Sequence, residues 1–291
     1  MEPDAPQLGN VANRGDIIKH VALVGLLRAL GPTIGRLLYV ETHAFRPEAT
    51  LSDDRVRAWT DATSTGLPKS AAAREYIELE RASLARGRYL CSVGLAKAVL
   101  RATRVGRTDC VLCEAGADSR RLLAASLWNA TILTDNALLE HSLTPRAGLF
   151  DAVFIHVDPY RLTDSETLFA AWLEGAKRAA KDVAPVVALV FDYENKGWPK
   201  EPVPGMRLIG TTSLPPFFLA AYGNAEGRRV CLDPLRAGGW SLTAARPPKN
   251  QGPAHGSALL RVPSGPRHHF RTFVMHKTIY VIHYICYYWR R

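Results

Sequence analysis

The chain has 291 residues, of which 47% are hydrophobic and 22% are charged, a composition typical of a globular protein and not of a disordered or fibrous one. It contains no run of about 18 apolar residues that could cross a membrane, and its acidic start, MEPDAPQLGN, lacks the apolar core of a secretory signal. Its five cysteines follow no regular spacing, so we expect reduced thiols in a cytoplasmic protein.

The formal net charge of +10 favours a polyanionic partner. Half of this charge comes from the stretch 267–291, which holds five basic residues and no acid. This tail is rich in Tyr, Ile and His, unlike the chain before it, and we interpret it as an edge strand, an RNA-contacting segment or a segment foreign to the domain. Its histidines have no carboxylate nearby and a single cysteine, Cys286, so we expect no metal site.

In chain order, a helix is expected first, from Asp16 as its cap to Gly31-Pro32 as its stop. A buried strand follows, from Leu37 to about Glu41. The interval to the next strand is too long for a loop, and it contains the charged helical run SAAAREYIELERASLARG. We therefore predict a helical insertion over 45–109.

The rest of the chain alternates short apolar strands with helices. Asp118 is expected to cap one helix, and another is expected from about Asp164 to Lys181. Cys110 and Cys113 form a C-x-x-C inside a strand-like run, where residues three apart face opposite sides, so core packing is favoured over a redox or zinc role. The expected strands are Cys110–Gly116, ATILTDN, Ala152–His156, Val186–Phe191, RLIGTT and SALLRV.

Acids stand at the ends of four consecutive expected strands, at Glu41, Glu114, Asp135 and Asp158. Continuously apolar strands alternating with helices predict a parallel sheet covered on both faces. Ligands of such sheets lie beyond the carboxyl ends of the strands. We therefore expect these acids to converge on a ligand that carries hydroxyls, an amine and a positive charge.

The chain lacks the G-x-x-x-x-G-K-[ST] loop of phosphate-binding proteins, and ETHAFRPEA has no glycine for a dinucleotide. S-adenosylmethionine suits the acids better. The acid after the second strand can accept hydrogen bonds from the ribose hydroxyls. The acid after the third can accept one from the adenine amino group, and the loop after the first can hold the cationic methionine part.

Six short segments, in the same order, resemble the adenine N6-methyltransferases of large-subunit ribosomal RNA of the RlmJ type. NRGDIIKH is similar to that family's N-x-x-D-[IV]-[IL]-K-H, and LLYVETHA to its strand followed by D-T-H-A-G-A-G. RYLCSVGLA resembles Y-x-G-S-P-x-x-A, while LCEAG, TDN and VDPY stand where the family has T-E-L-H, A-D-G and D-P-P-Y. The matches extend from Asn13 to about Val262.

The resemblance implies an α/β, Rossmann-like class I methyltransferase fold. Its sheet would have seven mostly parallel strands, with helices on both faces and a helical insertion after the first strand. The core would comprise residues 1–44 and 110–266, with the insertion at 45–109 and the atypical tail at 267–291.

The resemblance also implies a set of site residues. Glu114 would hold the ribose and Asp135 the adenine ring. Asp158, Pro159 and Tyr160 would be catalytic: the acid and a proline carbonyl aim the amino group, and the ring stacks on the base. The residues around S-adenosylmethionine would be Lys19, His20, His43, Ser92, Glu114, Asp135 and Asp158.

Three departures from the family pattern affect this site. Phe45, Arg46 and Pro47 replace the glycine-rich stretch, the D-P-P-Y motif is one proline short, and the N-terminal aromatic arm is missing. We expect methyl transfer to an amino group of a nucleobase, adenine in ribosomal RNA. The alternatives are an enzyme acting on a small molecule or on S-adenosylmethionine itself, and a non-catalytic binding protein. We expect a monomer with RNA or a small molecule as partner, and no membrane.

Overall fold

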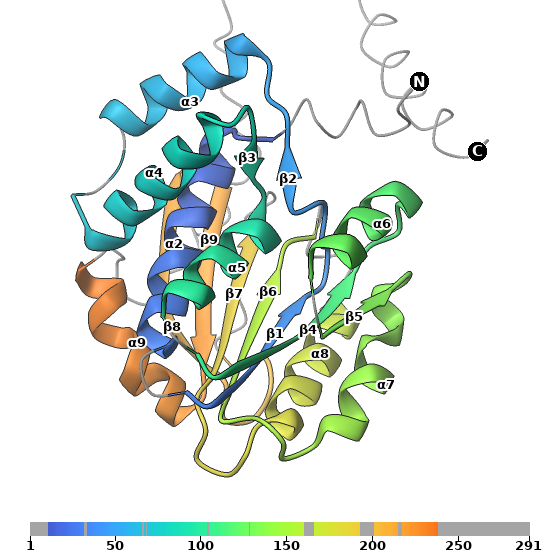
Figure 1. Ribbon diagram of the computed structural model, residues 1–291. Coiled ribbons are helices and arrows are strands. Elements are labelled where there is room, and N and C mark those ends of the chain that lie inside the picture. The colour runs from blue at the N-terminus through green and yellow to red at the C-terminus, as the bar shows by residue number, and fades with distance from the viewer. Residues whose placement is uncertain are drawn as a thin grey trace, which may run out of the picture. The chain divides into compact units, whose positions relative to one another are not determined.

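A computed structural model of the chain describes residues 11–31, 34–65, 67, 69–103, 105–127, 129–159, 166–192, 201–214 and 217–237 (Figure 1). A seven-stranded sheet lies at its centre, in the order β5-β4-β1-β6-β7-β9-β8. Every neighbouring pair of strands from β5 to β7 is parallel. β9 runs in the opposite direction and pairs antiparallel with both β7 and β8. The strands are β1 (Arg36–Glu41), β4 (Arg107–Cys113), β5 (Ala130–Leu133), β6 (Ala152–Val157), β7 (Val186–Asp192), β8 (Arg207–Leu214) and β9 (Phe217–Gly223). This confirms the predicted α/β, Rossmann-like fold with a mostly parallel seven-stranded sheet.

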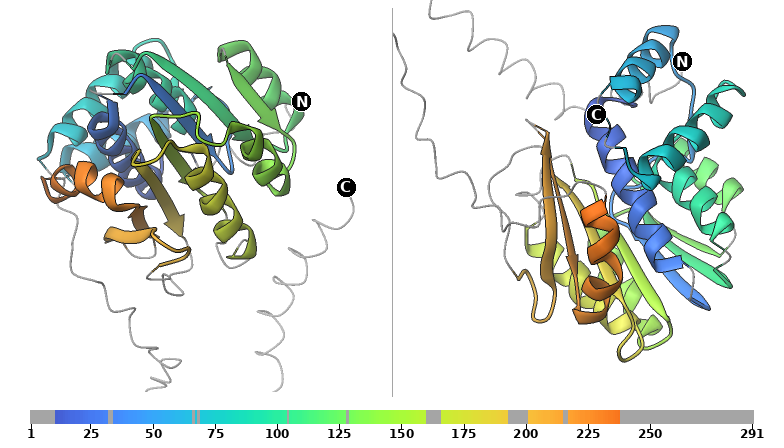
Figure 2. Two further views of the ribbon diagram at one scale, coloured as in Figure 1. Left: turned by 90° about the horizontal axis from the view of Figure 1, so that it is seen from below. Right: turned by 90° about the vertical axis from the view of Figure 1, so that its left-hand side faces the viewer.

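Helices cover both faces of the sheet, as expected for strands that are apolar throughout. One face packs against α2 (Arg14–Leu30), α5 (Ser92–Ala102), α6 (Ala117–Ser126) and α9 (Ala225–Ala237). The other packs against α7 (Leu139–Leu143) and α8 (Glu166–Ala179), which lie on the opposite side in Figure 2. Two short 3-10 turns, η2 (Asn136–Leu138) and η3 (Thr144–Arg146), flank α7.

The two cysteines of the C-x-x-C lie inside β4 and face opposite sides of the sheet. Cys110 packs in the core on the face covered by α5, and Cys113 in the core on the face covered by α7. Burial raises the pKa of each thiol to about 12, so neither is a thiolate at neutral pH. Both therefore serve as core residues.

The long interval between β1 and β4 is mainly helical. It contains β2 (Glu48–Ala49), α3 (Asp53–Thr65), α4 (Ala71–Leu84), β3 (Tyr89–Leu90) and α5. β2 and β3 form a two-stranded antiparallel ladder. α4 and α5 both pack on α2 (Figure 1). α5 approaches the loop after β1 so closely that a Cβ on Gly94 would lie 2.1 Å from the Pro47 carbonyl oxygen. The predicted division at residues 44, 109 and 266 stays a prediction, and the tail lies outside the described residues.

Several predicted boundaries were wrong. Asn13, not Asp16, caps α2: its side chain accepts a hydrogen bond from the Asp16 backbone N–H at 2.9 Å. α6 begins at Ala117 after Gly116, so Asp118 lies in its first turn and does not cap it. The other closing strand of the sheet is β9, which the sequence analysis missed, whereas SALLRV lies outside the described residues. No helix in the described ranges is both long and apolar enough to span a bilayer.

Candidate functional site

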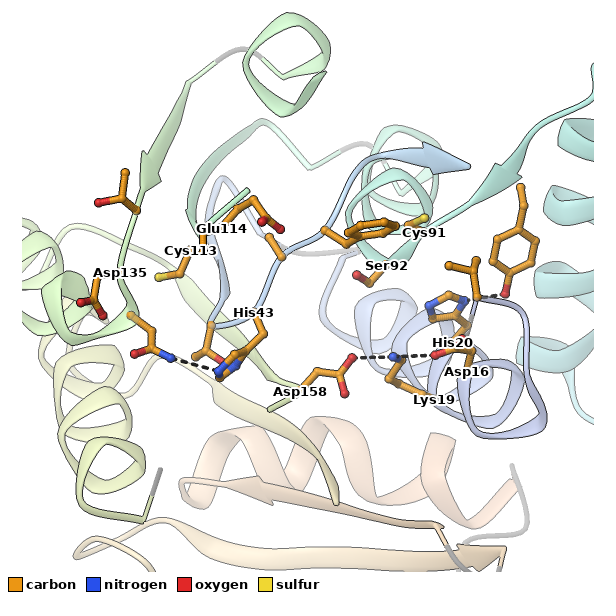
Figure 3. A pocket seen from close by; sticks show the side chains of 18 residues that line it. Asp16, Lys19, His20, His43, Cys91, Ser92, Cys113, Glu114, Asp135 and Asp158 are labelled. Carbon is orange, nitrogen blue, oxygen red and sulfur yellow. Dashed lines mark hydrogen bonds and ion pairs between the residues drawn. The ribbon is translucent and has the colours of Figure 1, made fainter. Parts of the chain in front are cut away.

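A cavity of about 630 Å³ lies where β1, β4, β5 and β6 reach their carboxyl ends, bordered by α2 and the start of α5 (Figure 3). Its volume is within the range of small-molecule sites. The structure brings together all the residues that the sequence analysis placed around the cofactor. These are Lys19, His20, His43, Ser92, Glu114, Asp135 and Asp158.

Glu41 was expected to join the other strand-end acids, and this was wrong. It is fully buried beside the cavity and does not line it. The Tyr39 hydroxyl donates to Oε2 of Glu41 at 2.8 Å, and the Ser92 hydroxyl donates to Oε1. Nδ1 of His156 lies 3.2 Å from the same oxygen. Glu41 is thus a buried acceptor that fixes Ser92 in the cavity wall.

Asp158, directly after β6, forms an ion pair with a lysine of α2. Nζ of Lys19 lies 2.5 Å from Oδ2 of Asp158 and 2.9 Å from Oδ1 of Asp16 (Figure 3). Burial raises the pKa of Asp158, but the Lys19 ammonium and His156 outweigh it, so the pKa lies below its usual value. The carboxylate therefore stays ionised at the cavity floor.

His43, after β1, is held in one neutral form by its neighbours. Burial lowers its pKa, although the carboxylates of Asp158 and Glu41 oppose the shift. Nδ2 of Asn136 donates to Nε2 of His43 at 3.0 Å, which leaves the ring proton on Nδ1, 2.8 Å from the Thr42 hydroxyl oxygen. The ring also packs edge-on against Trp172. His43 therefore presents a fixed, uncharged ring.

His20 connects the cavity to the helices that follow β1. Its Nδ1 lies 3.2 Å from the Tyr89 hydroxyl, which is 3.2 Å from the Tyr76 hydroxyl. The Trp59 indole N–H donates to Tyr76 at 2.9 Å. Burial, assisted by the Lys19 ammonium, lowers the pKa of His20 well below its usual value. His20 is therefore neutral at pH 7, and it fixes α3, α4 and β3 to α2.

Glu114 and Asp135 lie just past β4 and β5, on the opposite side of the cavity from Lys19 (Figure 3). One oxygen of Glu114 accepts the Gly116 backbone N–H at 2.5 Å. One oxygen of Asp135 accepts the Ala137 N–H at 2.8 Å. These bonds orient the two carboxylates.

The cavity is acidic. Four carboxylates line it, from Asp16, Glu114, Asp135 and Asp158, against the single ammonium of Lys19. The two histidines add no charge at neutral pH, because their pKa values are lowered. A ligand with a net positive charge is therefore favoured, and a ligand with several phosphates is disfavoured.

The sequence analysis missed several cavity residues. Asp16 and Asn136 could have been found, because each lies within a quoted motif, NRGDIIKH and TDN. Phe45, one of the residues that replace the glycines, lines the wall with Tyr89 and Cys91. Pro159 is buried beside Asp158, whereas Tyr160 lies outside the described residues. Within the described part of the chain, no cluster of three or more His, Cys, Asp or Glu side chains could hold a metal ion.

Comparison with known proteins found similar solved structures. No family model and no curated protein matches the chain. Protein LPL1258 from Legionella pneumophila, of the family DUF519, is similar with a TM-score of 0.54 and 19% identity, over 79% of this chain and 94% of that one. The chain shares the fold of this Legionella protein.

Two further structures are similar at lower TM-scores. A SAM-dependent methyltransferase from Aquifex aeolicus has a TM-score of 0.37 and 12% identity, over 76% of this chain and 99% of that one. Trm1 from Pyrococcus horikoshii, in complex with S-adenosyl-L-methionine, has a TM-score of 0.37 and 13% identity, over 77% of this chain and 58% of that one.

Proposed function

We propose that this protein binds S-adenosylmethionine in the cavity and transfers its methyl group to an amino group of a nucleobase, adenine in RNA. The observation that carries the proposal is the acidic cavity at the carboxyl edge of a parallel sheet. S-adenosylmethionine has an ammonium, a sulfonium and one carboxylate, so its net charge is positive. Its ribose hydroxyls and adenine amino group also need acceptors, and carboxylates supply them.

The spacing of the acids along the sheet supports separate roles. Glu114 would accept from the ribose hydroxyls, and Asp135, one strand further out, from the adenine amino group. The methionine part would lie toward the loop after β1, near His43 and Asp158. This order agrees with the resemblance to the RlmJ-type enzymes.

Methyl transfer from a sulfonium needs alignment more than proton transfer. Asp158 is ionised and tied to Lys19, so it offers a fixed acceptor for the hydrogens of an incoming amino group. With the Pro159 carbonyl it would aim the nitrogen lone pair at the methyl carbon. A base within RNA must leave its stack to reach this position.

Calorimetry followed by product analysis tests the proposal. We expect S-adenosylmethionine to bind the purified protein. With a trideuterated methyl donor, mass spectrometry of nucleosides from treated ribosomal RNA should show a labelled N6-methyladenosine. The absence of cofactor binding would refute the proposal, whereas binding without a labelled nucleoside would refute only the acceptor.

A second candidate, methyl transfer to a small molecule, is favoured by the wall of the cavity. Phe45 lines it where the resembling family has a glycine-rich stretch, and Arg46 lies over the Phe45 ring, 4.9 Å from its centroid. A large side chain there changes the space available beside the methionine part. A labelled small product in the absence of RNA would select this candidate.

A further inference from the structure

A basic groove lies beside the cavity, between α4, α5, α6 and the β2–β3 pair. Figure 1 labels these elements. Its volume is about 660 Å³. Glu48 is the one acid among its lining residues. Five cationic side chains line it: Arg46, Arg86, Arg88, Lys97 and Arg101. We call this surface the basic groove.

Three of these cations, Arg86, Arg88 and Arg101, keep their charge available. Arg86 donates to the Ala82 carbonyl and Arg88 to the Thr50 hydroxyl, each at 2.8 Å. Lys97 donates to the Ser126 carbonyl. These are neutral oxygens, and among the described residues Arg86, Arg88 and Arg101 pair with no carboxylate.

Several arginines elsewhere on the surface are arranged differently, although Arg120 and Arg146 also donate to neutral oxygens. Arg28, Arg57, Arg121, Arg178 and Arg229 each pair with an Asp or Glu. A concave surface on which cations are held by neutral oxygens concentrates positive potential and attracts a polyanion.

The basic groove shares a wall with the cavity. Phe45 lines the cavity, and the next residue, Arg46, lines the groove. α5 connects the two in the same way: Ser92 lies in the cavity wall, whereas Lys97 and Arg101, one turn apart, line the groove. From Ser92 to Arg101 the helix rises about 14 Å. A strand lying in the groove would therefore end beside the candidate methyl-transfer site.

We propose that the basic groove binds the phosphate backbone of a single-stranded RNA segment next to the nucleotide that enters the cavity. This inference rests on the proposed function for its RNA partner. A single strand suits the site because the target base must leave its stack, and positively charged grooves track the backbones of single strands. Base edges are not read here, so the groove supplies affinity and position more than sequence choice.

The test measures binding of a fluorescein-labelled, 20-nucleotide single-stranded RNA of mixed sequence by anisotropy at several salt concentrations. The groove variant is Arg86→Gln/Arg101→Gln in the full chain. Each lost phosphate contact lowers the slope of log affinity against log salt by about 0.7, so two should lower it by about 1.4 and weaken binding roughly 25-fold at 0.1 M salt. The matched control is Arg57→Gln/Arg229→Gln, which removes the same charge from ion-paired arginines of α3 and α9.

The control variant should keep the wild-type salt slope. Equal losses in the two variants would overturn the inference, because net charge alone would then explain binding. The wild-type protein should bind RNA more tightly than polyglutamate of equal charge. Equal affinities for the two polyanions would overturn the assignment to nucleic acid.

Calorimetry with S-adenosylmethionine on the same proteins separates this inference from the proposed function. Arg86 and Arg101 do not line the cavity, so the groove variant should bind the cofactor as the wild type does. If the protein binds the cofactor and the groove variant binds RNA as the wild type does, the role of the basic groove is refuted and the proposed function is not. Groove-dependent RNA binding without any cofactor binding supports the groove and refutes the proposed methyl transfer.

Discussion

The ammonium of Lys19 lies 2.5 Å from the carboxylate of Asp158, although 139 positions separate the two residues in the chain. The pair joins α2 to the end of β6 at the floor of the cavity. The Lys19 ammonium also lies over the Phe191 ring, 5.2 Å from the ring centroid. The ion pair with Lys19 keeps Asp158, the residue that would face the methyl acceptor, in its charged form.

Replacing Lys19 with Met should lower the free energy of unfolding at pH 7 by about 2 kcal/mol, because the partly buried carboxylate of Asp158 then loses its cationic partner. The folded-state pKa of Asp158 lies below its usual value, so the pair stabilises the fold above about pH 4 and loses this effect as pH falls further. Urea unfolding from pH 7 to pH 3 should show the difference from wild type shrinking with acid. Lys181→Met, which breaks the exposed pair with Asp151, is the control and should cost less than about 1 kcal/mol.

His20→Gln should reduce the loss of unfolding free energy that the wild type shows as the pH falls below about 6.5. The folded protein keeps His20 neutral, because its pKa is lowered, whereas the unfolded chain takes up a proton near pH 6.5. Wild-type stability should therefore fall with decreasing pH below about 6.5, by up to about 1.4 kcal/mol per pH unit for this group. Urea unfolding between pH 7.5 and pH 5 measures the slope. His141→Gln, at an exposed position of α7, should leave the profile unchanged, and equal slopes for wild type and His20→Gln would contradict the prediction.

Glu114→Gln should weaken S-adenosylmethionine binding by about 1–3 kcal/mol, because the ribose hydroxyls lose a charged acceptor. Glutamine keeps an oxygen for the Gly116 N–H, so the local turn is preserved. Calorimetry measures the change. Glu140→Gln, which removes a carboxylate paired with Arg178 on the surface, is the control. An affinity equal to that of this control would remove Glu114 from the site.

Glu41→Gln should cost about 3 kcal/mol of stability. The Tyr39 and Ser92 hydroxyls donate to different oxygens of the Glu41 carboxylate, and glutamine keeps only one oxygen, so one buried hydroxyl would face an NH₂ that cannot accept from it. Chemical denaturation gives the free energy of unfolding. Glu174→Gln, on the partly exposed side of α8, should change it little. A small effect in both variants would show that Glu41 is not a structural acceptor.

The sequence determined the sheet and the edge at which the site lies. Strands that are buried on both faces consist of apolar runs, which can be recognised in the sequence. The carboxyl ends of parallel strands meet at one edge of the sheet. For this reason Glu114, Asp135 and Asp158 could be placed together from three short motifs. β9 was missed because Ala220, Ala221 and Gly223 have low strand propensity. In the folded chain, hydrogen-bonded pairing with both β7 and β8 stabilises the strand in spite of this low propensity.

Only the tertiary structure decided which acids face the cavity. Glu41 is the last residue of β1, two positions after Tyr39, so its side chain is directed to the same face of the sheet, beneath α5. Glu114 and Asp158 each come one residue past their strands, where the chain has left the ladder and a side chain can turn into the cavity. A shift of one residue at a strand end separates the two outcomes, and sequence patterns do not resolve strand ends that finely. The Lys19–Asp158 pair likewise depends on how α2 packs on the sheet, which is a long-range property of the folded chain.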